Sequence, residues 1–244
     1  MSGPLADRVA LVTGGAKRLG REIALALARA GAEVAFTYSS SEAEAAETAR
    51  DIGKLGRRAA AFSCDLRDGR QVDDMVAGAV AAFGAIDVLV LSAAVFRRTP
   101  LETATDEDWD YHFDTNARGA YLVARRVGPQ MRARGGSIIL IGDVAGLRPW
   151  GNYIPYSASK AAVIALTQGL AVALAPEVRV NAIAPGPVLA PSGGGEADLQ
   201  HAAERTLLRR HGSAQDITGA VLYLATANFV TGVVLPVDGG RHLA

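Results

Sequence analysis

The chain contains little that points to disulfides or to nucleic acid. Its 244 residues include one cysteine, Cys64, so no disulfide forms within the chain, and a reducing, cytoplasmic compartment is expected. Cys64 ends an apolar run and is expected to be a core residue, not a nucleophile. The 25 basic residues balance 25 acidic ones without a basic stripe or tail, so neither nucleic acid nor an anionic membrane is an expected partner.

Long apolar segments are also scarce. No charged segment followed by an apolar one opens the chain, so no signal peptide is expected. The most apolar stretch, residues 161–175, is interrupted by polar and small residues at 167–169 and is too short to span a bilayer. It is expected to be a helix that is buried, either within the chain or at a subunit interface. No metal site is expected.

Strand-like apolar runs alternate with helix-like segments along the chain. With half of its residues hydrophobic, a chain of 244 residues suits one large α/β core, so residues 1–244 are expected to form a single domain. The seven predicted strands lie near 8–13, 33–38, 58–63, 86–91, 137–142, 178–184 and 233–237, and helix-like segments lie near 42–55, 70–83, 106–134 and 213–226. This alternation predicts a doubly wound parallel sheet flanked by helices, with ligands at the carboxyl ends of the strands.

The N-terminal region contains a strand, a glycine-rich turn and a helix. The apolar run 8–13 leads directly into Gly14–Gly20, and helical spacing of apolar residues follows at 21–30. Glycines in such a turn let the backbone approach a pyrophosphate, whose charge is stabilised by the N–H groups at the helix N-terminus. A tight turn with a purely structural role is the alternative.

Tyr156 and Lys160 lie four residues apart in YSASK, and Asp143 lies thirteen residues upstream of the tyrosine. In a helix over 156–174, positions i and i+4 share a face, so the Lys160 ammonium is expected to approach the Tyr156 phenol. A nearby cation favours the ionised phenol, so Lys160 is expected to lower the pKa of Tyr156 and improve it as a proton donor. Without its context, the pattern fits an ordinary pair on a helix surface better.

The loops that follow the strands are the expected ligand-binding segments. They comprise 14–20, 39–41, 64–66, 92–96, 143–153 and 185–195. The glycine-rich stretch Pro191–Gly195 is predicted to be the hinge of a substrate lid over about 187–212.

The motifs TGGAKRLG, CDL, DTNARGAY, YSASK, RVNAIAPGPV and VDGG follow one another in this chain as they do in the short-chain dehydrogenases/reductases, which the chain resembles over nearly its whole length. The resemblance implies a Rossmann-type fold, a nicotinamide cofactor, a small-molecule substrate and a homotetramer. It also implies that Asn116 holds a water in a proton relay with Lys160. The alternative for Asn116 is a polar helix residue that bonds to nearby backbone.

The same resemblance, together with the loop positions, gives the expected cofactor residues. They are Gly14, Lys17, Arg18, Leu19, Gly20, Tyr38, Ser39, Ser40, Ser41, Asp65, Leu66, Ser92, Ala93, Ala94, Pro185, Gly186 and Val188. Asp65 is expected at the adenine by resemblance, and a turn or cap role is its alternative.

The end of the second predicted strand indicates which nicotinamide cofactor binds. NAD-specific proteins place an acidic residue there for the ribose 2′-hydroxyl, and an acid would repel the 2′-phosphate of NADP. Here three serines, 39–41, follow Tyr38, and Lys17 and Arg18 of the glycine turn can pair with a phosphate. NADPH is therefore favoured over NADH. The alternative for the serines is a helix N-cap.

Two departures from the common family pattern concern the substrate. The usual Asn-Asn-Ala-Gly run is Leu-Ser-Ala-Ala at 91–94, and Asp143 replaces the usual catalytic serine. A serine hydroxyl can stabilise negative charge that develops on a carbonyl oxygen, whereas an ionised carboxylate opposes it. The carboxylate is also expected to raise the pKa of Tyr156 against Lys160, so the three groups should titrate together.

With an aspartate at this position, the chain resembles the pteridine reductase branch of the family. This resemblance implies a pterin or dihydropterin substrate. Asp143 would accept hydrogen bonds from its ring and amino N–H groups, and Phe96 would stack on the pterin. Ordinary loop packing is the alternative for Phe96. Ala94 replaces a serine of that branch, and Arg97 and Arg98 add charge that is either solvated or meets an anionic substrate group.

Two other functions stay open from the sequence. A 3-oxoacyl-carrier-protein reductase or another carbonyl/alcohol dehydrogenase would use the same YSASK motif. A non-catalytic NADP-binding sensor is disfavoured because the chain keeps Tyr156, Lys160 and Asn116.

Overall fold

The computed structural model describes residues 3–190 and 195–244, and its framework is a seven-stranded, all-parallel sheet. The strand order is β3-β2-β1-β4-β5-β6-β7. The strands are β1 Val9–Thr13, β2 Glu33–Tyr38, β3 Ala59–Ser63, β4 Val88–Leu91, β5 Gly136–Ile141, β6 Val178–Pro185 and β7 Val234–Val237. All seven predicted strands are confirmed, each within two residues of its predicted ends. Apart from Gly195, the predicted hinge at Pro191–Gly195 lies outside the described residues.

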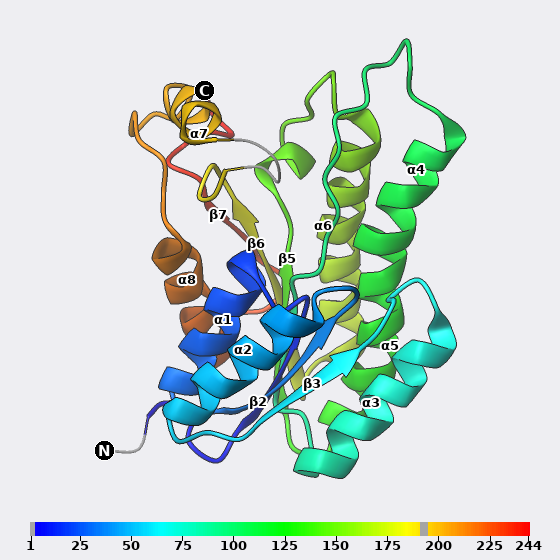
Figure 1. The fold of residues 1–244 in the computed structure, drawn as a ribbon, viewed down its shortest axis with the longest axis vertical. Helices are drawn as coiled ribbons and strands as arrows, with labels where there is room; N and C mark the ends of the chain where they lie inside the picture. The colour runs from blue at the N-terminus through cyan, green and yellow to red at the C-terminus, as the bar shows by residue number, and fades with distance from the viewer. Residues whose placement is uncertain (1–2, 191–194) are drawn as a thin grey trace.

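Helices cover both faces of the sheet, which makes a three-layer structure (Figure 1). One face carries α1 (Arg18–Arg29), α2 (Glu42–Lys54) and α8 (Ala214–Thr226), and the other carries α3 (Gly69–Phe83), α5 (Ala120–Met131) and α6 (Ile154–Leu174). Central strands are apolar and fully buried on both sides, as in β1 and β4, because each face packs against helices. Every loop after a strand therefore opens at the same edge.

The predicted helical segment 106–134 is not one regular helix. It consists of α4 (Asp106–His112), the π-helix η1 (Phe113–Gly119) and α5. A capping box at Thr105 and Asp108 starts α4. The wider π turn contains Asn116, and such turns occur often at functional sites. The prediction of a helical segment here is confirmed, and the change of register at η1 is a feature that the sequence pattern did not reveal.

Two short helices complete the edge formed by the carboxyl ends of the strands. The 3-10 helix η2 (Val144–Gly146) follows β5, and α7 (Glu196–Ala203) lies in the segment predicted as a lid. In Figure 1, α7 lies close to the C-terminus at the end of the molecule where β6 and β7 finish. Hydrogen bonds join the segment after α7 to the segment after β7, because Leu208 N donates to Gly239 O and the Arg241 side chain donates to Arg205 O.

Helix α6 is more exposed than predicted. By length and composition it could cross a membrane, with a mean hydropathy of 1.4 over an 18-residue window, of which 39% is buried. However, it packs against β6, η1 and η2, as in the core helix of a globular domain. Its outer face is apolar and open, and Val172 is 83% exposed. Burial of this helix within the single chain is therefore incomplete, and burial at a subunit interface stays a prediction.

A buried carboxylate joins three strands at the opposite edge of the sheet. Asp87, at the start of β4, is 1% exposed and accepts a hydrogen bond of 2.9 Å from Val9 N. Its other carboxylate oxygen lies 3.1 Å from both Arg8 Nη1 and Arg134 Nε. This arrangement satisfies a buried N–H that would otherwise be left without a partner.

We expect Asp87→Ala to lower the free energy of unfolding by about 1–3 kcal/mol, because the Val9 N–H loses its acceptor. Urea unfolding at fixed protein concentration measures the change. The control is Asp74→Ala on α3, whose exposed side chain makes no ion pair or hydrogen bond within the described residues and should alter stability by less than about 0.5 kcal/mol. Equal effects of the two substitutions would contradict this role for Asp87.

Candidate functional site

Asp143 and Tyr156 meet directly at the carboxyl edge of the sheet. Asp143 follows β5 and caps η2, where its Oδ1 accepts a hydrogen bond of 2.7 Å from Ala145 N. Its Oδ2 accepts a hydrogen bond of 2.6 Å from the Tyr156 hydroxyl. The backbone bond fixes the carboxylate, so the phenol is held by a group that cannot rotate freely. The pair predicted from sequence is therefore brought together.

Lys160 lies one turn along α6 from Tyr156, on the same face of the helix. Its ammonium donates a hydrogen bond of 2.9 Å to Ile141 O and lies 5.9 Å from the centre of the Tyr156 ring. The two side chains belong to residues that are only 3% and 5% exposed. Their spacing in the sequence thus places them together, as predicted, although the lysine bonds to backbone and not to the phenol oxygen.

Burial decides the protonation behaviour of this group. It raises the pKa of Tyr156 well above its usual range, and the Asp143 carboxylate raises it further. The predicted lowering by Lys160 is wrong for this structure, because the carboxylate contacts the hydroxyl while the ammonium faces a backbone carbonyl. Burial also lowers the pKa of Lys160 to about 8, against the attraction of Asp143.

The pKa of Asp143 itself is raised by burial, although the hydrogen bonds from Tyr156 and Ala145 and the charge of Lys160 oppose this shift. Each of the three titratable groups thus affects the protonation of another, as the sequence predicted.

Asn116 uses its amide to join the π-helix to two other segments. Its Oδ1 accepts from Val95 N at 2.8 Å, and its Nδ2 donates to Val95 O at 3.1 Å and to Ser159 Oγ at 3.0 Å. The alternative predicted for Asn116, bonding to backbone, is therefore observed. The water relay with Lys160 stays a prediction.

Three aromatic side chains pack against the Tyr156 ring, and a fourth, Tyr153, packs against two of them. Phe96 contacts it edge-on at 4.8 Å and stacks on Tyr153 at 4.8 Å with an angle of 9° between the rings. Trp150 lies 6.5 Å from Tyr156, and His112 lies 6.0 Å from it on another side. Phe96 remains 38% exposed, so it lines the site and also packs in its loop.

Sequence reasoning missed Trp150, Tyr153 and His112. A signal for the first two was present, because aromatic residues make up only 6% of the chain and three of them fall within 150–156. His112 gave no such signal. Its Nε2 accepts from Arg97 N at 3.2 Å, and its ring packs on Tyr156, contacts that only the fold creates.

The glycine turn after β1 has no room for side chains at two positions. A Cβ on Gly14, whose φ is +68°, would lie 3.0 Å from Ala93 Cα, and a Cβ on Gly20 would lie 2.1 Å from Gly14 O. Thr13 Oγ1 accepts from the N–H groups of Ser92 and Ala93 and so ties this turn to the loop after β4. The turn opens onto the N-terminus of α1, a geometry that fits the pyrophosphate of a nicotinamide dinucleotide.

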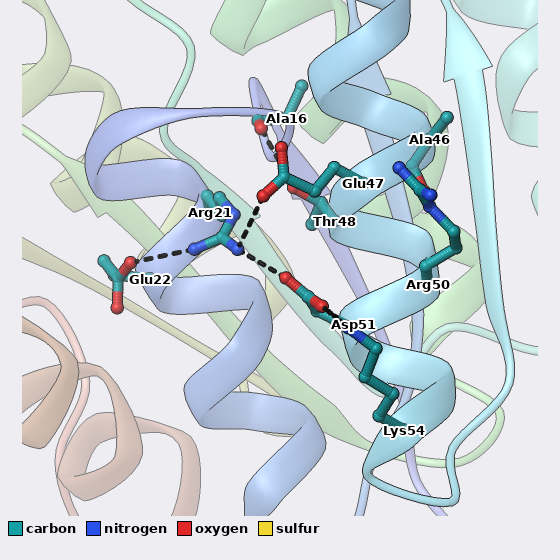
Figure 2. A network of polar contacts seen from close by, with 9 residues as sticks. All are labelled: Ala16, Arg21, Glu22, Ala46, Glu47, Thr48, Arg50, Asp51 and Lys54. Carbon is teal, nitrogen blue, oxygen red and sulfur yellow. Dashed lines mark hydrogen bonds and ion pairs between the residues drawn. The ribbon is translucent and has the colours of Figure 1, made fainter.

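A polar network braces this turn from α2 (Figure 2). Thr48 is buried and its hydroxyl donates 2.9 Å to Ala16 O in the turn. Beside it, Arg21 on α1 pairs with Asp51 at 2.6 Å, and Asp51 also pairs with Lys54 at 2.7 Å. These contacts hold the first turn of α1 against α2, which fixes the backbone N–H groups at the α1 N-terminus.

The residues expected at the adenosine end lie on the surface around the turn. Ser39 and Ser40 are exposed after β2, and Ser41 occupies the N-cap position of α2 without a side-chain cap bond. Lys17 is exposed, and the Arg18 guanidinium donates to Ala190 O in the predicted lid.

Asp65 pairs with Arg67, with Nη2 and Oδ2 2.6 Å apart, and accepts from Arg67 N, which lowers the pKa of Asp65. The turn role foreseen as its alternative is thus observed. Cys64 beside it is 2% exposed, and burial raises its pKa to about 11, as suits a core thiol.

The other predicted cofactor residues lie along the same edge of the sheet. They are Leu19, Leu66, Ala94, Pro185, Gly186 and Val188. Gly186 is required by close packing, since a Cβ there would lie 2.6 Å from Asp238 Cα. Whether these residues touch a cofactor stays a prediction.

The chain is similar to known proteins over nearly its whole length. A family model described as enoyl-(acyl carrier protein) reductase matches residues 14–242. A 3-oxoacyl-[acyl-carrier-protein] reductase of Staphylococcus epidermidis is 34% identical over 97% of this chain and 100% of its own length. An L-rhamnose 1-dehydrogenase (NAD(P)(+)) of a Sphingomonas species is 34% identical over 98% of both chains.

Solved structures show the same similarity. Carveol dehydrogenase from Mycobacterium avium in complex with NAD superposes with a TM-score of 0.93 at 30% identity and covers 99% of this chain and 100% of its own. A blue fluorescent protein from a metagenomic library in complex with NADPH superposes with a TM-score of 0.91 at 34% identity, over 98% and 99% of the two chains.

We expect Asp143→Asn to lower the pKa of Lys160 below its value of about 8, because the carboxylate that favours the charged ammonium is lost. An NMR titration that follows the lysine side-chain resonances measures it, with Asp65→Asn as a control away from Lys160. A Lys160 pKa that rises or stays constant in Asp143→Asn would contradict the coupling.

Proposed function

Because this chain belongs to the short-chain dehydrogenase/reductase family of nicotinamide-dependent oxidoreductases, we propose that it is an NADPH-dependent reductase of a pterin or dihydropterin, with Tyr156 as proton donor. The observation that carries the proposal is the hydrogen bond of 2.6 Å from the Tyr156 hydroxyl to the Asp143 carboxylate. The common serine of the family would donate a hydrogen bond at this place, whereas an ionised carboxylate accepts one.

A carboxylate in this position suits a C=N bond better than a C=O bond. Reduction of a carbonyl builds negative charge on oxygen, which Asp143 would repel at close range. A pterin presents ring and amino N–H groups, and these donate to a carboxylate. Because burial raises the pKa of Asp143, this residue can also hold a proton next to Tyr156 at a pH above the usual range of aspartate.

The side chains of the site then have distinct tasks. When bound, the nicotinamide cofactor supplies the hydride. Tyr156 holds the proton on its hydroxyl at the point where the substrate nitrogen would lie. Lys160 places a positive charge beneath the phenol ring while its ammonium is anchored on Ile141 O. Asp143 orients the tyrosine hydroxyl and accepts hydrogen bonds from the substrate.

The aromatic side chains favour a flat substrate. Phe96 presents an exposed ring beside Tyr156, and its parallel stack with Tyr153 fixes its orientation. Stacking on such a rigid ring is favourable for a planar heterocycle and excludes water from the reacting atoms.

Preference for NADPH rests on charge at the end of β2. Ser39 and Ser40 are exposed there without an acidic neighbour in the loop, and Lys17 and Arg18 lie in the adjacent glycine turn. A 2′-phosphate would find donors and cations at this place, while the ribose 2′-hydroxyl of NADH lacks the carboxylate that usually binds it.

Reduction of a 3-oxoacyl thioester is the second candidate. The 3-oxoacyl-[acyl-carrier-protein] reductase at 34% identity favours it, and the family model, described as enoyl-(acyl carrier protein) reductase, shares the acyl-carrier-protein substrate although not the reaction. As in the pterin reaction, the Tyr156 hydroxyl must turn from Asp143 toward the substrate. In addition, Asp143 must be protonated so that the charge developing on the ketone oxygen is not opposed.

The open face of α6 supports the homotetramer that the family resemblance implies. This face carries no charged side chain, because the one charged residue of α6, Lys160, is buried on the other side. Val172 on the open face is 83% exposed. A second copy of the helix would bury it. Light scattering of the purified protein measures the assembly.

We expect Asp143→Ser to reduce turnover of dihydrobiopterin and dihydrofolate at least tenfold more than turnover of an acetoacetyl thioester, because the serine restores a donor suited to an oxyanion and removes the acceptor for pterin N–H groups. NADPH oxidation with each substrate, for both enzymes, gives the ratio. Equal losses on both substrate classes would contradict this role for Asp143. Wild-type turnover of the thioester alone would favour the second candidate.

We expect Ser39→Asp to shift the ratio of kcat/KM for NADPH over NADH by about 100-fold toward NADH, since the new carboxylate repels the 2′-phosphate and binds the 2′-hydroxyl. Steady-state kinetics with both cofactors measures the shift, and Ser39→Asn keeps the size without the charge. An unchanged ratio would place the phosphate elsewhere.

A further inference from the structure

A second polar site lies beside the aromatic group, with which it shares Trp150. It is a pocket of about 480 Å³ whose lining includes Trp150 and the arginines Arg148, Arg205, Arg209 and Arg241. The arginines come from three segments that are far apart in the sequence: the loop before α6, the segment after α7 and the end that follows β7. Only the fold brings these four cations together.

The charge of the pocket is not neutralised from within. In the part of the chain that the structure describes, none of the four guanidinium groups lies within 4.0 Å of a carboxylate. Instead, Arg209 donates 2.6 Å to Glu204 O and Arg241 donates 3.2 Å to Arg205 O. Glu204 lines the pocket too, but its carboxylate is 63% exposed and lies nearest to His201, at 3.6 Å.

The arginines also disfavour one another. Burial lowers the pKa of Arg241, and the positive charges of Arg205 and Arg148 lower it further. Arg241 is partly buried, whereas Arg148, Arg205 and Arg209 are exposed. An anion would relieve the repulsion among them, and planar guanidinium groups bind carboxylate and phosphate through paired hydrogen bonds.

Arg97, the cation that the sequence placed near the substrate, is already engaged. It pairs with Asp108 at 3.1 Å and lies over the Tyr111 ring at 4.2 Å. The pocket arginines have no such partner among the described residues, which makes the pocket the stronger anion site.

Trp150 connects the pocket to the reacting group. Its ring lies 6.5 Å from Tyr156 and 5.8 Å from Tyr153, and it also lines the pocket. A substrate whose reacting atoms lie at Tyr156 would therefore extend past Trp150 toward the four arginines.

We propose that this pocket binds an anionic group, a carboxylate or a phosphate, on the part of the substrate farthest from the reacting atoms. The inference rests on the proposed function, since it takes Tyr156 as the reacting end. It adds a requirement that the Tyr156 group alone does not impose, namely a negatively charged tail.

Matched substrates test it. Dihydrofolate carries a glutamate that dihydrobiopterin lacks, and acetoacetyl-coenzyme A carries phosphates that acetoacetyl-N-acetylcysteamine lacks. In the double variant Arg148→Gln/Arg205→Gln, we expect KM to rise about 10- to 100-fold for the charged member of each pair, because charge-assisted hydrogen bonds to its anionic group are lost. For the uncharged member, we expect KM to rise less than about twofold. The kcat should change little, because neither arginine contacts Tyr156.

The control variant is Arg29→Gln/Arg50→Gln, which removes the same charge from the exposed surfaces of α1 and α2. Figure 2 shows Arg50 on the outer side of α2, away from Arg21 and Asp51. Equal changes in KM for charged and uncharged substrates, or equal effects of the two double variants, would overturn the proposal.

A binding measurement separates this inference from the proposed activity. The chain has two tryptophans, so Trp109→Phe leaves Trp150 as the only one. With NADP present at saturation, titration with p-aminobenzoylglutamate and, separately, with coenzyme A should change its fluorescence in a saturable way, and the arginine double variant should lose the response.

The outcomes are distinct. A response without turnover of any substrate would sink the proposed function and leave the pocket assignment standing. A response to only one probe would identify carboxylate or phosphate as the natural group. Turnover without a response, or an arginine variant that changes only the assembly state in light scattering, would overturn the pocket assignment.

Discussion

The hydrogen bond between Tyr156 and Asp143 sets the conditions for the whole site, because it places a potential anion against the proton donor in a region from which water is largely excluded. The loss of hydration of such a carboxylate must be offset by hydrogen bonds and by a nearby positive charge. The carboxylate obtains one bond from the phenol and one from Ala145 N, and Lys160 supplies the nearest positive charge. The short helix η2, which follows β5, presents the Ala145 N–H to this carboxylate.

The fold meets this demand with contacts from separate layers. Helix α6 supplies both Tyr156 and Lys160, β5 leads to Asp143, and η1 supplies Asn116. Because parallel strands all end at one edge, residues far apart in sequence converge there without long loops. At the other edge the buried Asp87 joins three strands, so the two ends of the sheet use carboxylates for different purposes: one for structure and one for chemistry.

Sequence periodicity was sufficient for the sheet, since buried parallel strands are continuous apolar runs bounded by polar residues. It also placed Tyr156 and Lys160 correctly, because helical spacing alone brings them together. It failed where contacts between distant segments decide. The π-helical turn around Asn116, the contact of His112 with Tyr156 and the meeting of four arginines beside Trp150 depend on which loops become neighbours. The raised pKa of Tyr156 was foreseen only in part, from the Asp143 carboxylate, because the pattern does not report burial, which is the larger cause.

Asn116 holds the backbone of Val95 through two bonds and reaches Ser159 with a third. The loop that carries Phe96 and the helix that carries Lys160 are therefore clamped to a common support. A loop exchange that aims at a new substrate shape would have to preserve the backbone position of residue 95, or it would displace the proton-transfer group together with the wall of the binding site. In this architecture, selectivity and catalytic alignment do not evolve independently.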